Sequence, residues 1–326
     1  MDGSRLEVMN HVEKFVHEQL NKFLRPVDQI WQPADFLPDS RSASFFDEVR
    51  NLQERAKELA YDFWAVLIGD TITEEALPTY ESWLMAMEGV NQLERNGWTQ
   101  WIRGWTAEEN RHGDLLNKYL YLSGRVDMRQ VELSTQYLLQ DGFDIGTAAD
   151  PYRNFVYTSF QEMATLISHQ RVGAIARKQD NPELAKICNK IATDEGRHAH
   201  AYQSFVTKIF EVDPSEMMLA FADMMKKKIV MPAHYLRELG VDLGTTFSHF
   251  SDAAQRLGVY TSNDYVEILE SLVKMWKIDK VPDLNDAGEK ARDYLMKLPD
   301  RLRRVSERLQ IPETTYEYSW IGIRKN

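Results

Sequence analysis

Two short segments of this sequence carry a glutamate and a histidine three residues apart on an otherwise apolar helical face. Glu109 and His112 form one pair, and Glu195 and His198 form the other. Residues three apart on a helix project from the same side, so each pair is expected to point into the interior. A buried carboxylate is costly unless its charge is compensated. One such pair could be a surface pair or a satisfied core histidine, but two identically spaced copies indicate a shared role.

Each pair is preceded by a further carboxylate that is expected to face inward. Glu162 lies 33 residues before Glu195, and Glu74 lies 35 residues before Glu109. The sequence therefore contains a degenerate repeat, in which each half supplies one helix with Glu and one with Glu-x-x-His. Dimetal helix bundles of the ferritin type use this ligand set. Glu75 is as acidic as its neighbour Glu74, and we expect one of the two to be solvated.

Charge and ligand type together indicate two metal ions. Four buried carboxylates carry four negative charges, which two divalent cations would cancel. Carboxylate oxygens with only two imidazoles suit iron or manganese, whereas structural zinc sites hold more nitrogen and sulfur. The sequence has no His-Glu-x-x-His, which disfavours a zinc protease site. The predicted ligands are Glu74, Glu109, His112, Glu162, Glu195 and His198.

The remaining sequence predicts an all-α protein that would hold these side chains. Gly124 suits a helix stop, Pro151 suits a start, and no useful strand alternation is present. We expect a single helical domain over residues 1–326, with a ferritin-like di-iron four-helix bundle core at roughly 60–232 and a helical extension at 233–326. The expected helices span residues 44–60, 71–90, 97–122, 127–140, 152–178, 181–212, 214–231, 264–277 and 286–297.

Composition excludes several classes of partner. The net charge of −11 makes nucleic acid or an anionic membrane an unexpected partner. The longest wholly apolar run, residues 63–68, is too short for membrane insertion. The acidic N-terminal residues are unlike a transit peptide, and the single cysteine, Cys188, fits a reducing compartment. We expect a soluble cytoplasmic protein, with the plastid stroma as the alternative.

Longer stretches of the sequence resemble the plant-type soluble acyl-acyl-carrier-protein desaturases, from about residue 8 to 320. The matching stretches are residues 70–80, 105–114, 119–130, 194–198 and 221–225. The resemblance implies two irons per subunit. In the family pattern, the glutamates of the two Glu-x-x-His motifs bridge the irons, the other two glutamates bind terminally, and each histidine binds one iron. Thr165 matches a threonine on the oxygen-binding side of the cluster.

The resemblance also implies an activity and partners. The expected reaction is O2-dependent introduction of a cis double bond into an acyl chain on acyl carrier protein, in fatty acid biosynthesis. Ferredoxin is the implied electron donor, and a homodimer is implied. Trp31 and Asp194 match residues of an electron route through His112; packing of an aromatic ring and orientation of a histidine explain them equally well. No flavin or nicotinamide fingerprint is visible, so electrons must come from outside.

Two sets of residues are candidates for contacts with the substrate. An acidic carrier protein needs a local basic patch, and Lys226, Lys227 and Lys228 form the best candidate, although a solvated charge run explains them as well. Trp83, Ala86 and Met87 lie where the family lines its acyl cavity. Trp83 and Met87 are bulky, which suggests a cavity for a different acyl chain length or double-bond position than the usual stearoyl substrate. Packing in the core is the competing explanation for these two side chains.

Two departures from the family pattern keep other functions open. The second motif usually reads Asp-Glu-Lys-Arg-His-Glu, but this chain has Gly196 and Ala199 in place of the lysine and the final glutamate. A degenerate binding protein is therefore one alternative. An iron-storage or ferroxidase bundle shares the ligand set but is usually much shorter. A radical-generating reductase subunit would need a tyrosine close to the cluster.

Overall fold

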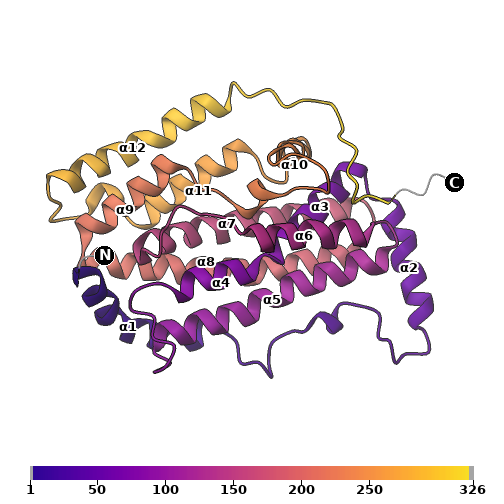
Figure 1. The fold of residues 1–326 in the computed structure, drawn as a ribbon, viewed down its shortest axis with the longest axis horizontal. Coiled ribbons are helices and arrows are strands. Elements are labelled where there is room, and N and C mark those ends of the chain that lie inside the picture. Colours follow the sequence, from indigo (N-terminus) through magenta and orange to yellow (C-terminus); the bar gives the residue numbers. More distant parts are fainter. Residues whose placement is uncertain (1–2, 323–326) are drawn as a thin grey trace.

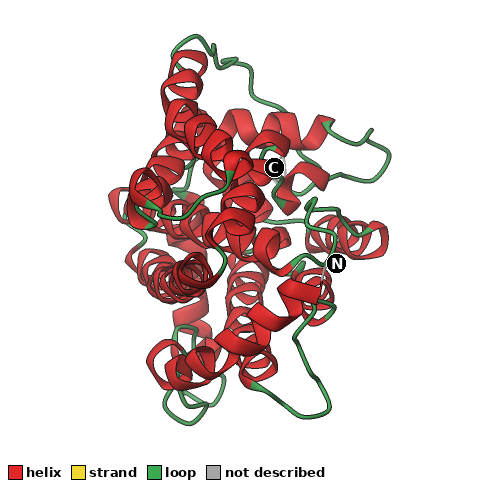
Figure 2. Ribbon diagram, turned by 90° about the vertical axis from the view of Figure 1, so that its left-hand side faces the viewer, coloured by secondary structure: helices red, strands yellow, loops and turns green. Residues whose placement is uncertain are grey.

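The computed structural model describes residues 3–322, which form a bundle of helices (Figures 1 and 2). No strand is assigned in that range, where an isolated bridge joins Val126 and Ile321. The all-α prediction is confirmed. The helices are α1 (Gly3–Phe23), α2 (Phe45–Lys57), α3 (Tyr61–Glu74), α4 (Leu77–Met85), α5 (Gly97–Ser123), α6 (Met128–Asp141), α7 (Pro151–Lys178), α8 (Pro182–Val212), α9 (Pro214–Lys227), α10 (Thr245–Leu257), α11 (Ser262–Met275) and α12 (Asp286–Ser306), with 3-10 turns η1 (Pro33–Asp35), η2 (Pro232–Tyr235) and η3 (Ile278–Lys280).

Four of these helices, α3, α5, α7 and α8, carry the six predicted metal ligands. α7 and α8 are joined by only three residues and pack along one another as an antiparallel pair, while α5 packs against α3 and α8. The inward faces of α5 and α8 hold fully buried aromatic side chains, including Trp98, Trp101 and Tyr202. Such wide apolar faces fix the rotation of each helix, and with it the direction in which its charged residues point.

Local signals in the sequence set the ends of these long helices. The side chain of Asp150 accepts hydrogen bonds from the backbone N–H groups of Tyr152 (2.9 Å) and Arg153 (3.2 Å), with Pro151 at the first helical position of α7. Gly124, at φ 65°, ends α5 in the left-handed conformation that glycine adopts at little cost. The predicted start at Pro151 and stop at Gly124 are confirmed.

The C-terminal helices pack directly on the bundle. α12 lies against α9 and α11, α11 lies against α7, and α10 lies against α3. In Figure 1, α12 runs along the outer side of α9 and α11, on the edge of the molecule away from α5. Gly69 of α3 permits the close approach of α10, because a Cβ atom there would lie 2.3 Å from the Phe250 ring. The C-terminal extension therefore covers α3 and α7.

Several helix boundaries differ from those predicted. The apolar run 63–68 lies inside α3, and the chain breaks the helix after Glu74 rather than starting one at 71. The helices α1 and α10 were not predicted. α12 extends to Ser306, well beyond the predicted end at 297, because Pro299 is accommodated inside it. α1 and α12 are rich in charged residues, which obscured their apolar faces, whereas α10 has a clear apolar face that the prediction missed.

Among residues 3–322, no helix combines the length and the apolar character needed to cross a bilayer.

Candidate metal centre

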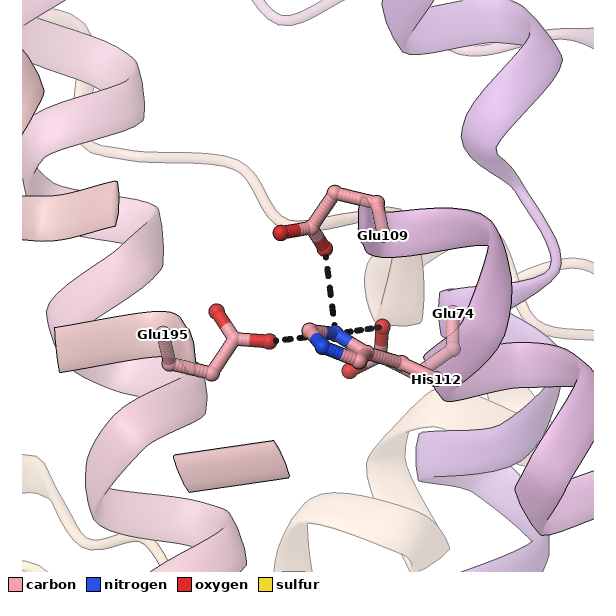
Figure 3. Close-up of side chains that lie close together, drawn as sticks. All are labelled: Glu74, Glu109, His112 and Glu195. Atoms are coloured by element: carbon pink, nitrogen blue, oxygen red, sulfur yellow. Dashed lines mark ion pairs between the residues drawn. The ribbon is translucent and has the colours of Figure 1, made fainter. Parts of the chain in front are cut away.

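The six predicted ligand side chains converge in the middle of the bundle. Two groups of potential ligand atoms form there, each with all of its atoms within 4.8 Å of one another. Figure 3 shows the first group, in which three carboxylates from α3, α5 and α8 surround one imidazole. Glu109 and Glu195 belong to both groups. The groups are Glu74, Glu109, His112 and Glu195, and Glu109, Glu162, Glu195 and His198.

Both imidazoles turn the same ring nitrogen toward the carboxylates. His112 Nδ1 lies 3.0 Å from Glu195 Oε1 and 3.4 Å from Glu109 Oε2. His198 Nδ1 lies 2.5 Å from Glu109 Oε1 and 3.7 Å from Glu162 Oε2. The two shared glutamates thus lie between the two histidines, which is the placement that bridging ligands require.

Protein donors hold one oxygen of three carboxylates and leave the other oxygen directed at the cluster. Trp105 Nε1 donates to Glu162 Oε1 (2.9 Å), and Thr165 Oγ1 donates to Glu195 Oε2 (2.6 Å). His169 Nε2 lies 2.8 Å from Glu74 Oε1. These contacts fix the side-chain rotamers, so the second oxygens are oriented before any ion binds.

Glu74 and Glu75, which the sequence could not distinguish, have different surroundings. Glu74 Oε2 faces His112 Nδ1 at 3.8 Å, whereas Glu75 accepts hydrogen bonds from Asn117 and Thr135 outside the cluster. The close approach of α3 and α5 depends on Gly113, because a Cβ atom there would lie 3.1 Å from Glu75 Cγ. The break after Glu74 and this glycine together bring the last residue of α3 to the metal centre.

The donor set fits a metal pair. Several of its atoms are buried and, among residues 3–322, make no hydrogen bond of suitable geometry even where they lie close to one another. Such atoms are rare and costly in a folded interior. All of them point into the same small volume, and their oxygen and imidazole character suits iron or manganese. These atoms are Glu109 Oε1, His112 Nδ1, Glu162 Oε2, Glu195 Oε1 and His198 Nδ1.

The pKa values reflect the crowding of charge. Burial raises the pKa of Glu162, and the nearby Glu109 and Glu195 raise it further. Burial also opposes ionisation of Glu109, but the two imidazoles outweigh burial and lower its pKa to about 2. Burial lowers the pKa of His198, yet Glu109 and Glu108 more than compensate and bring it to about 9. The imidazoles therefore carry protons that a metal must displace.

The outer nitrogen of His112 faces the predicted electron route. His112 Nε2 lies 3.5 Å from Asp194 Oδ2, and Trp31 Nε1 donates to that same oxygen at 2.8 Å. The Trp31 ring is stacked on the His112 ring at 6.0 Å, with 7° between the planes. The structure thus brings these three residues together, while their role in electron transfer stays a prediction.

Three charged residues around the histidines were missed by the sequence analysis. Glu108 Oε2 lies 2.9 Å from His198 Nε2, and Arg111 and Arg197 contact Asp194 at 3.3 and 2.8 Å. A signal was present, because both copies of the motif read acidic-Glu-x-Arg-His. Of the acidic and arginine positions, the sequence analysis assigned a role to Asp194 alone, so Glu108, Arg111 and Arg197 were not predicted.

An apolar cavity of about 720 Å³ borders the cluster on the α3 and α7 side. It lies beneath α9 to α12, and its wall includes Thr165, whose hydroxyl contacts Glu195. Lys226, Lys227 and Lys228 also line it. Its volume falls in the usual range for sites that enclose a small molecule.

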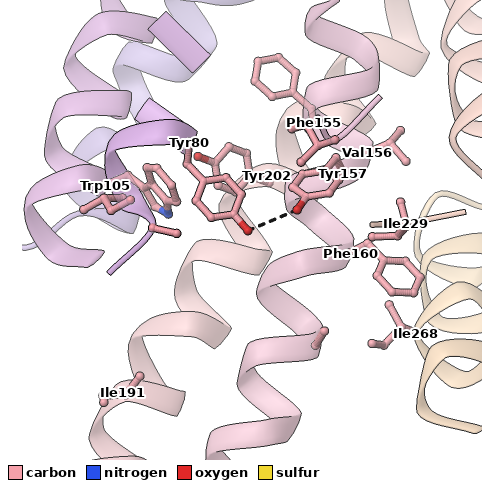
Figure 4. Close-up of a cluster of buried hydrophobic side chains, with 14 of the residues drawn as sticks. Tyr80, Trp105, Phe155, Val156, Tyr157, Phe160, Ile191, Tyr202, Ile229 and Ile268 are labelled. Carbon is pink, nitrogen blue, oxygen red and sulfur yellow. Dashed lines mark hydrogen bonds between the residues drawn. The ribbon is translucent and has the colours of Figure 1, made fainter. Parts of the chain in front are cut away.

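The predicted acyl-cavity residues do not line this cavity. Trp83 donates its indole N–H to the Phe143 carbonyl at 3.3 Å, Met87 is buried in the core and Ala86 is exposed. A cluster of large side chains fills the neighbouring interior, where Tyr80 and Tyr157 meet through their hydroxyls at 3.3 Å (Figure 4). The assignment of these three residues to an acyl cavity stays a prediction.

The fold and the buried cluster define a helical protein of the carboxylate- and histidine-containing metal-bundle class. The model of the fatty acid desaturase family matches residues 4–322. A chloroplastic stearoyl-[acyl-carrier-protein] 9-desaturase of Ricinus communis is 51% identical over 100% of this chain and 83% of its own length. The stearoyl-[acyl-carrier-protein] 9-desaturase 1 of Arabidopsis thaliana, also chloroplastic, is 50% identical over 95% of this chain and 79% of its own length. This chain belongs to the fatty acid desaturase family.

A solved structure supports the fold independently. The X-ray structure of DesA2 from Mycobacterium tuberculosis H37Rv matches 85% of this chain and 97% of its own, with a TM-score of 0.53 and 18% sequence identity. At that identity the likeness concerns the fold alone.

The different surroundings of Glu74 and Glu75 make a matched test of the metal site. Glu74→Gln should lose metal, because an uncharged amide binds cations poorly, and we expect bound iron to fall to about half or less. Glu75→Gln should retain it. Elemental analysis of both variants after anaerobic iron loading measures the difference. Equal iron content in the two variants would contradict the assignment of Glu74.

Metal binding should depend on pH in a defined direction. The folded pKa of about 9 for His198 lies above the ordinary value, so the ring is protonated at neutral pH and a metal must expel that proton. Affinity should then fall about tenfold per displaced proton for each pH unit below about 9. Competition with a chelator between pH 6 and 8 measures this, together with proton release in weak buffer. A pH-independent affinity would refute it.

Proposed function

We propose that this protein is an acyl-[acyl-carrier-protein] desaturase that uses a di-iron centre, O2 and an external electron donor to place a cis double bond in a saturated acyl chain. The observation that supports the proposal most directly is the contact between an apolar cavity and a buried Glu/His cluster at Thr165. Family membership and the two plant desaturases at about half identity support the substrate class.

The reaction sets demands that the chain's own residues can meet. Removing two hydrogens from adjacent methylenes while reducing O2 to two waters consumes two electrons and two protons. A bound iron pair would supply O2 activation and hydrogen abstraction, which no side chain can perform on an unactivated methylene. Glu74 and Glu162 would each hold one iron with His112 and His198, respectively. The cavity would hold the chain in line and exclude water.

The carrier protein is proposed to dock around the cavity on α9 and α12. Lys226 Nζ lies 5.2 Å from the Tyr294 ring centroid of α12, so the three lysines and this helix form one surface. Exposed basic residues of α12 and the residues after it alternate with side chains that line the cavity, such as Leu302. An acidic carrier protein would complement this rim despite the net charge of −11. The basic residues are Lys297, Arg301, Arg304 and Arg308.

Ferredoxin is the proposed electron donor, with Trp31, Asp194 and His112 as the route to the cluster. Support comes from the contacts among these residues and from the low exposure of Trp31, which is 9% and places the ring just beneath the surface. We also propose a homodimer, on the family resemblance. The predicted cytoplasmic location stays a proposal, with the plastid stroma of the chloroplastic relatives as the alternative.

The whole chain is proposed to work as one domain, with the bundle core at roughly 60–232 and the extension at 233–326. The extension supplies one wall of the cavity through α10, α11 and α12, while α3 and α7 of the core supply the other. Neither part encloses the cavity alone, which is the support for a single functional unit.

One observation favours a second candidate, the radical-generating class. In the part of the chain that the structure describes, the buried hydroxyl of Tyr202 has no hydrogen-bond partner. Its ring lies 6.1 Å from that of Trp105, whose indole N–H donates to Glu162. The apolar cavity favours the desaturase, since a radical generator needs no acyl site. The cavity likewise disfavours an iron-storage bundle, and the six converging ligands disfavour a degenerate binding protein.

The proposed activity can be tested with iron-loaded protein, ferredoxin, ferredoxin reductase, O2 and acyl carrier proteins that bear saturated chains of different lengths. We expect monounsaturated products for at least one chain length, analysed by mass spectrometry with double-bond location. The control is the Glu74→Gln variant, which should form none. A stable tyrosyl radical signal without unsaturated product would favour the second candidate.

The carrier surface can be tested by charge reversal at Lys228, for which no ion-pair partner appears in residues 3–322. Lys228→Glu should raise KM for acyl carrier protein roughly two- to five-fold with little change in kcat, since exposed charge pairs contribute up to about 1 kcal/mol. The effect should shrink as salt increases. The matched control is Lys14→Glu on α1, whose side chain is 85% exposed. An unchanged KM would exclude Lys228 from the carrier surface.

A further inference from the structure

Among residues 3–322, Asp70 is the one carboxylate in the wall of the apolar cavity. It lies one helical turn before Glu74 on α3, and it forms no ion pair with any described residue. Its Oδ2 accepts a hydrogen bond from the Ser168 hydroxyl of α7 at 3.0 Å. A carboxylate that faces an apolar cavity without a counter-ion is costly, so its presence there calls for a chemical role.

Asp70 begins a polar strip that ends at the metal cluster. Thr73 lies three residues after it on α3, and Thr165 lies three residues before Ser168 on α7, so each pair projects from one side of its helix. All four line the cavity, whose other wall residues on these two helices are apolar. The Ser168–Asp70 hydrogen bond joins the helices, and Thr165 Oγ1 donates to Glu195 Oε2 at 2.6 Å. The strip thus connects a carboxyl group in the cavity wall to a shared ligand of the cluster.

The surroundings of Asp70 favour its protonated form. Burial raises the pKa of this carboxyl above its usual range, while His169 and the Ser168 hydroxyl act in the opposite direction. Two other titratable groups nearby are neutral at pH 7, because burial raises the pKa of the Cys188 thiol of α8 and lowers that of His234, which lines the cavity from η2. The cavity-lining residues of α10 are uncharged, and α5 and α6, which also pack on α3, supply none.

We propose that Asp70 supplies a proton to the metal centre from the cavity side, through the hydroxyl groups of this strip, while O2 is reduced. The inference rests on the proposed desaturase function, in which reduction of O2 to two waters takes up two protons and two electrons. The Asp70 carboxyl releases its proton to a water held between its oxygen and the Thr165 hydroxyl. That water passes one of its own protons to the oxygen that is being reduced. A buried water needs about two to four polar partners, which Asp70, Ser168 and Thr165 provide.

The cavity has a polar end from which Asp70 can regain a proton. This end lies at the turn between α10 and α11, which Arg171 ties to α7: its Nη1 donates to the Gly258 carbonyl at 3.1 Å, and its Nη2 pairs with Asp264 at 2.5 Å. The Arg171 side chain is 39% exposed, so the turn lies at the protein surface. Solvent protons therefore have a route into the cavity that is lined by polar groups. These groups belong to Gln255, Tyr260, Thr261 and Ser262.

The protonation of Asp70 can be measured apart from any turnover. The sample is full-length protein with carboxyl-¹³C aspartate and with diamagnetic zinc in place of iron, followed by NMR over a pH series. The resonance that Asp70→Asn removes should titrate above the ordinary aspartate value of about 3.9. Ser168→Ala should raise that pKa further, because the hydroxyl that stabilises the carboxylate is lost. An Asp70 carboxyl that titrates in the ordinary range would refute the inference.

Single-turnover desaturation by iron-loaded protein tests proton delivery itself. Asp70→Asn should slow product formation by about 100-fold, a usual contribution of a positioned acid, with iron content unchanged. In the unaltered protein the rate should fall as pH rises through the Asp70 pKa, and this dependence should vanish in Asp70→Asn. Asp70→Glu, which keeps a carboxyl group, should restore part of the rate. Ser168→Ala should slow product formation by about tenfold, and it serves as the test if Asp70→Asn does not fold.

The matched control is Asp47→Asn on α2, whose side chain is 69% exposed, and it should change neither the rate nor its pH dependence. If folded Asp70→Asn behaves like this control, or if it loses iron, the inference is wrong. If the unaltered protein forms no unsaturated product, the proposed function fails and this inference fails with it. A failure confined to the Asp70 and Ser168 variants leaves the proposed function standing, so the two failures are distinguishable.

Discussion

Mutual compensation of buried charge is the constraint on which this structure depends. Four carboxylates and two imidazoles share an interior that is otherwise lined by tryptophan, tyrosine and phenylalanine, and none of them could be buried there alone. Each must therefore face the others, which fixes the rotation and the axial position of α3, α5, α7 and α8 together. Removing one partner from such a group leaves the rest uncompensated. The six clustered side chains therefore help to determine how the four helices pack, and their positions are not only a result of that packing.

The sequence was sufficient to predict which side chains converge, because the repeat obeys helical spacing. Glu109 with His112 and Glu195 with His198 interrupt long apolar stripes, and a stripe on a long helix is the most reliable pattern in a sequence. Glu74 was harder to assign, because it lies where α3 ends and its neighbour Glu75 is chemically identical. Only tertiary contacts, namely the approach of α5 at Gly113 and the hydrogen bonds of Glu75 to Asn117 and Thr135, separate the two.

Other features could not be obtained from spacing at all. The cavity is assembled from α3 and α7 and from helices of the extension, one of which, α10, was not predicted although one of its faces is apolar. Its lining residues are far apart in the chain, so no local window contains them. Likewise, the contact of Glu108 with His198 joins positions 90 residues apart. The repeat alone did not predict this contact, because the prediction would require knowing that α5 and α8 face each other across the cluster.

The arrangement gives the cluster two chemically different sides. On the α3 and α7 side, Thr165 separates the carboxylates from an apolar cavity. On the α5 and α8 side, the outer imidazole nitrogens meet Glu108 and Asp194, which in turn pair with Arg111 and Arg197. This charged layer also binds the chain between Phe23 and Trp31. Under the proposed function, an apolar substrate and an electron donor would therefore approach the cluster from different directions. The substrate would not have to leave before the electron donor binds, nor the donor before the substrate.

The departure from the family pattern at Gly196 is compatible with the geometry of the cluster. A Cβ atom at Gly196 would meet only the Leu166 side chain, at 3.8 Å, so the backbone has room for a side chain and does not require glycine there. The cost of glycine inside a helix is about 1 kcal/mol relative to alanine. α8 can tolerate that cost because it is capped by Asn181 and packed along α7 over most of its length. The glycine therefore leaves the clustered atoms of Glu195 and His198 in place.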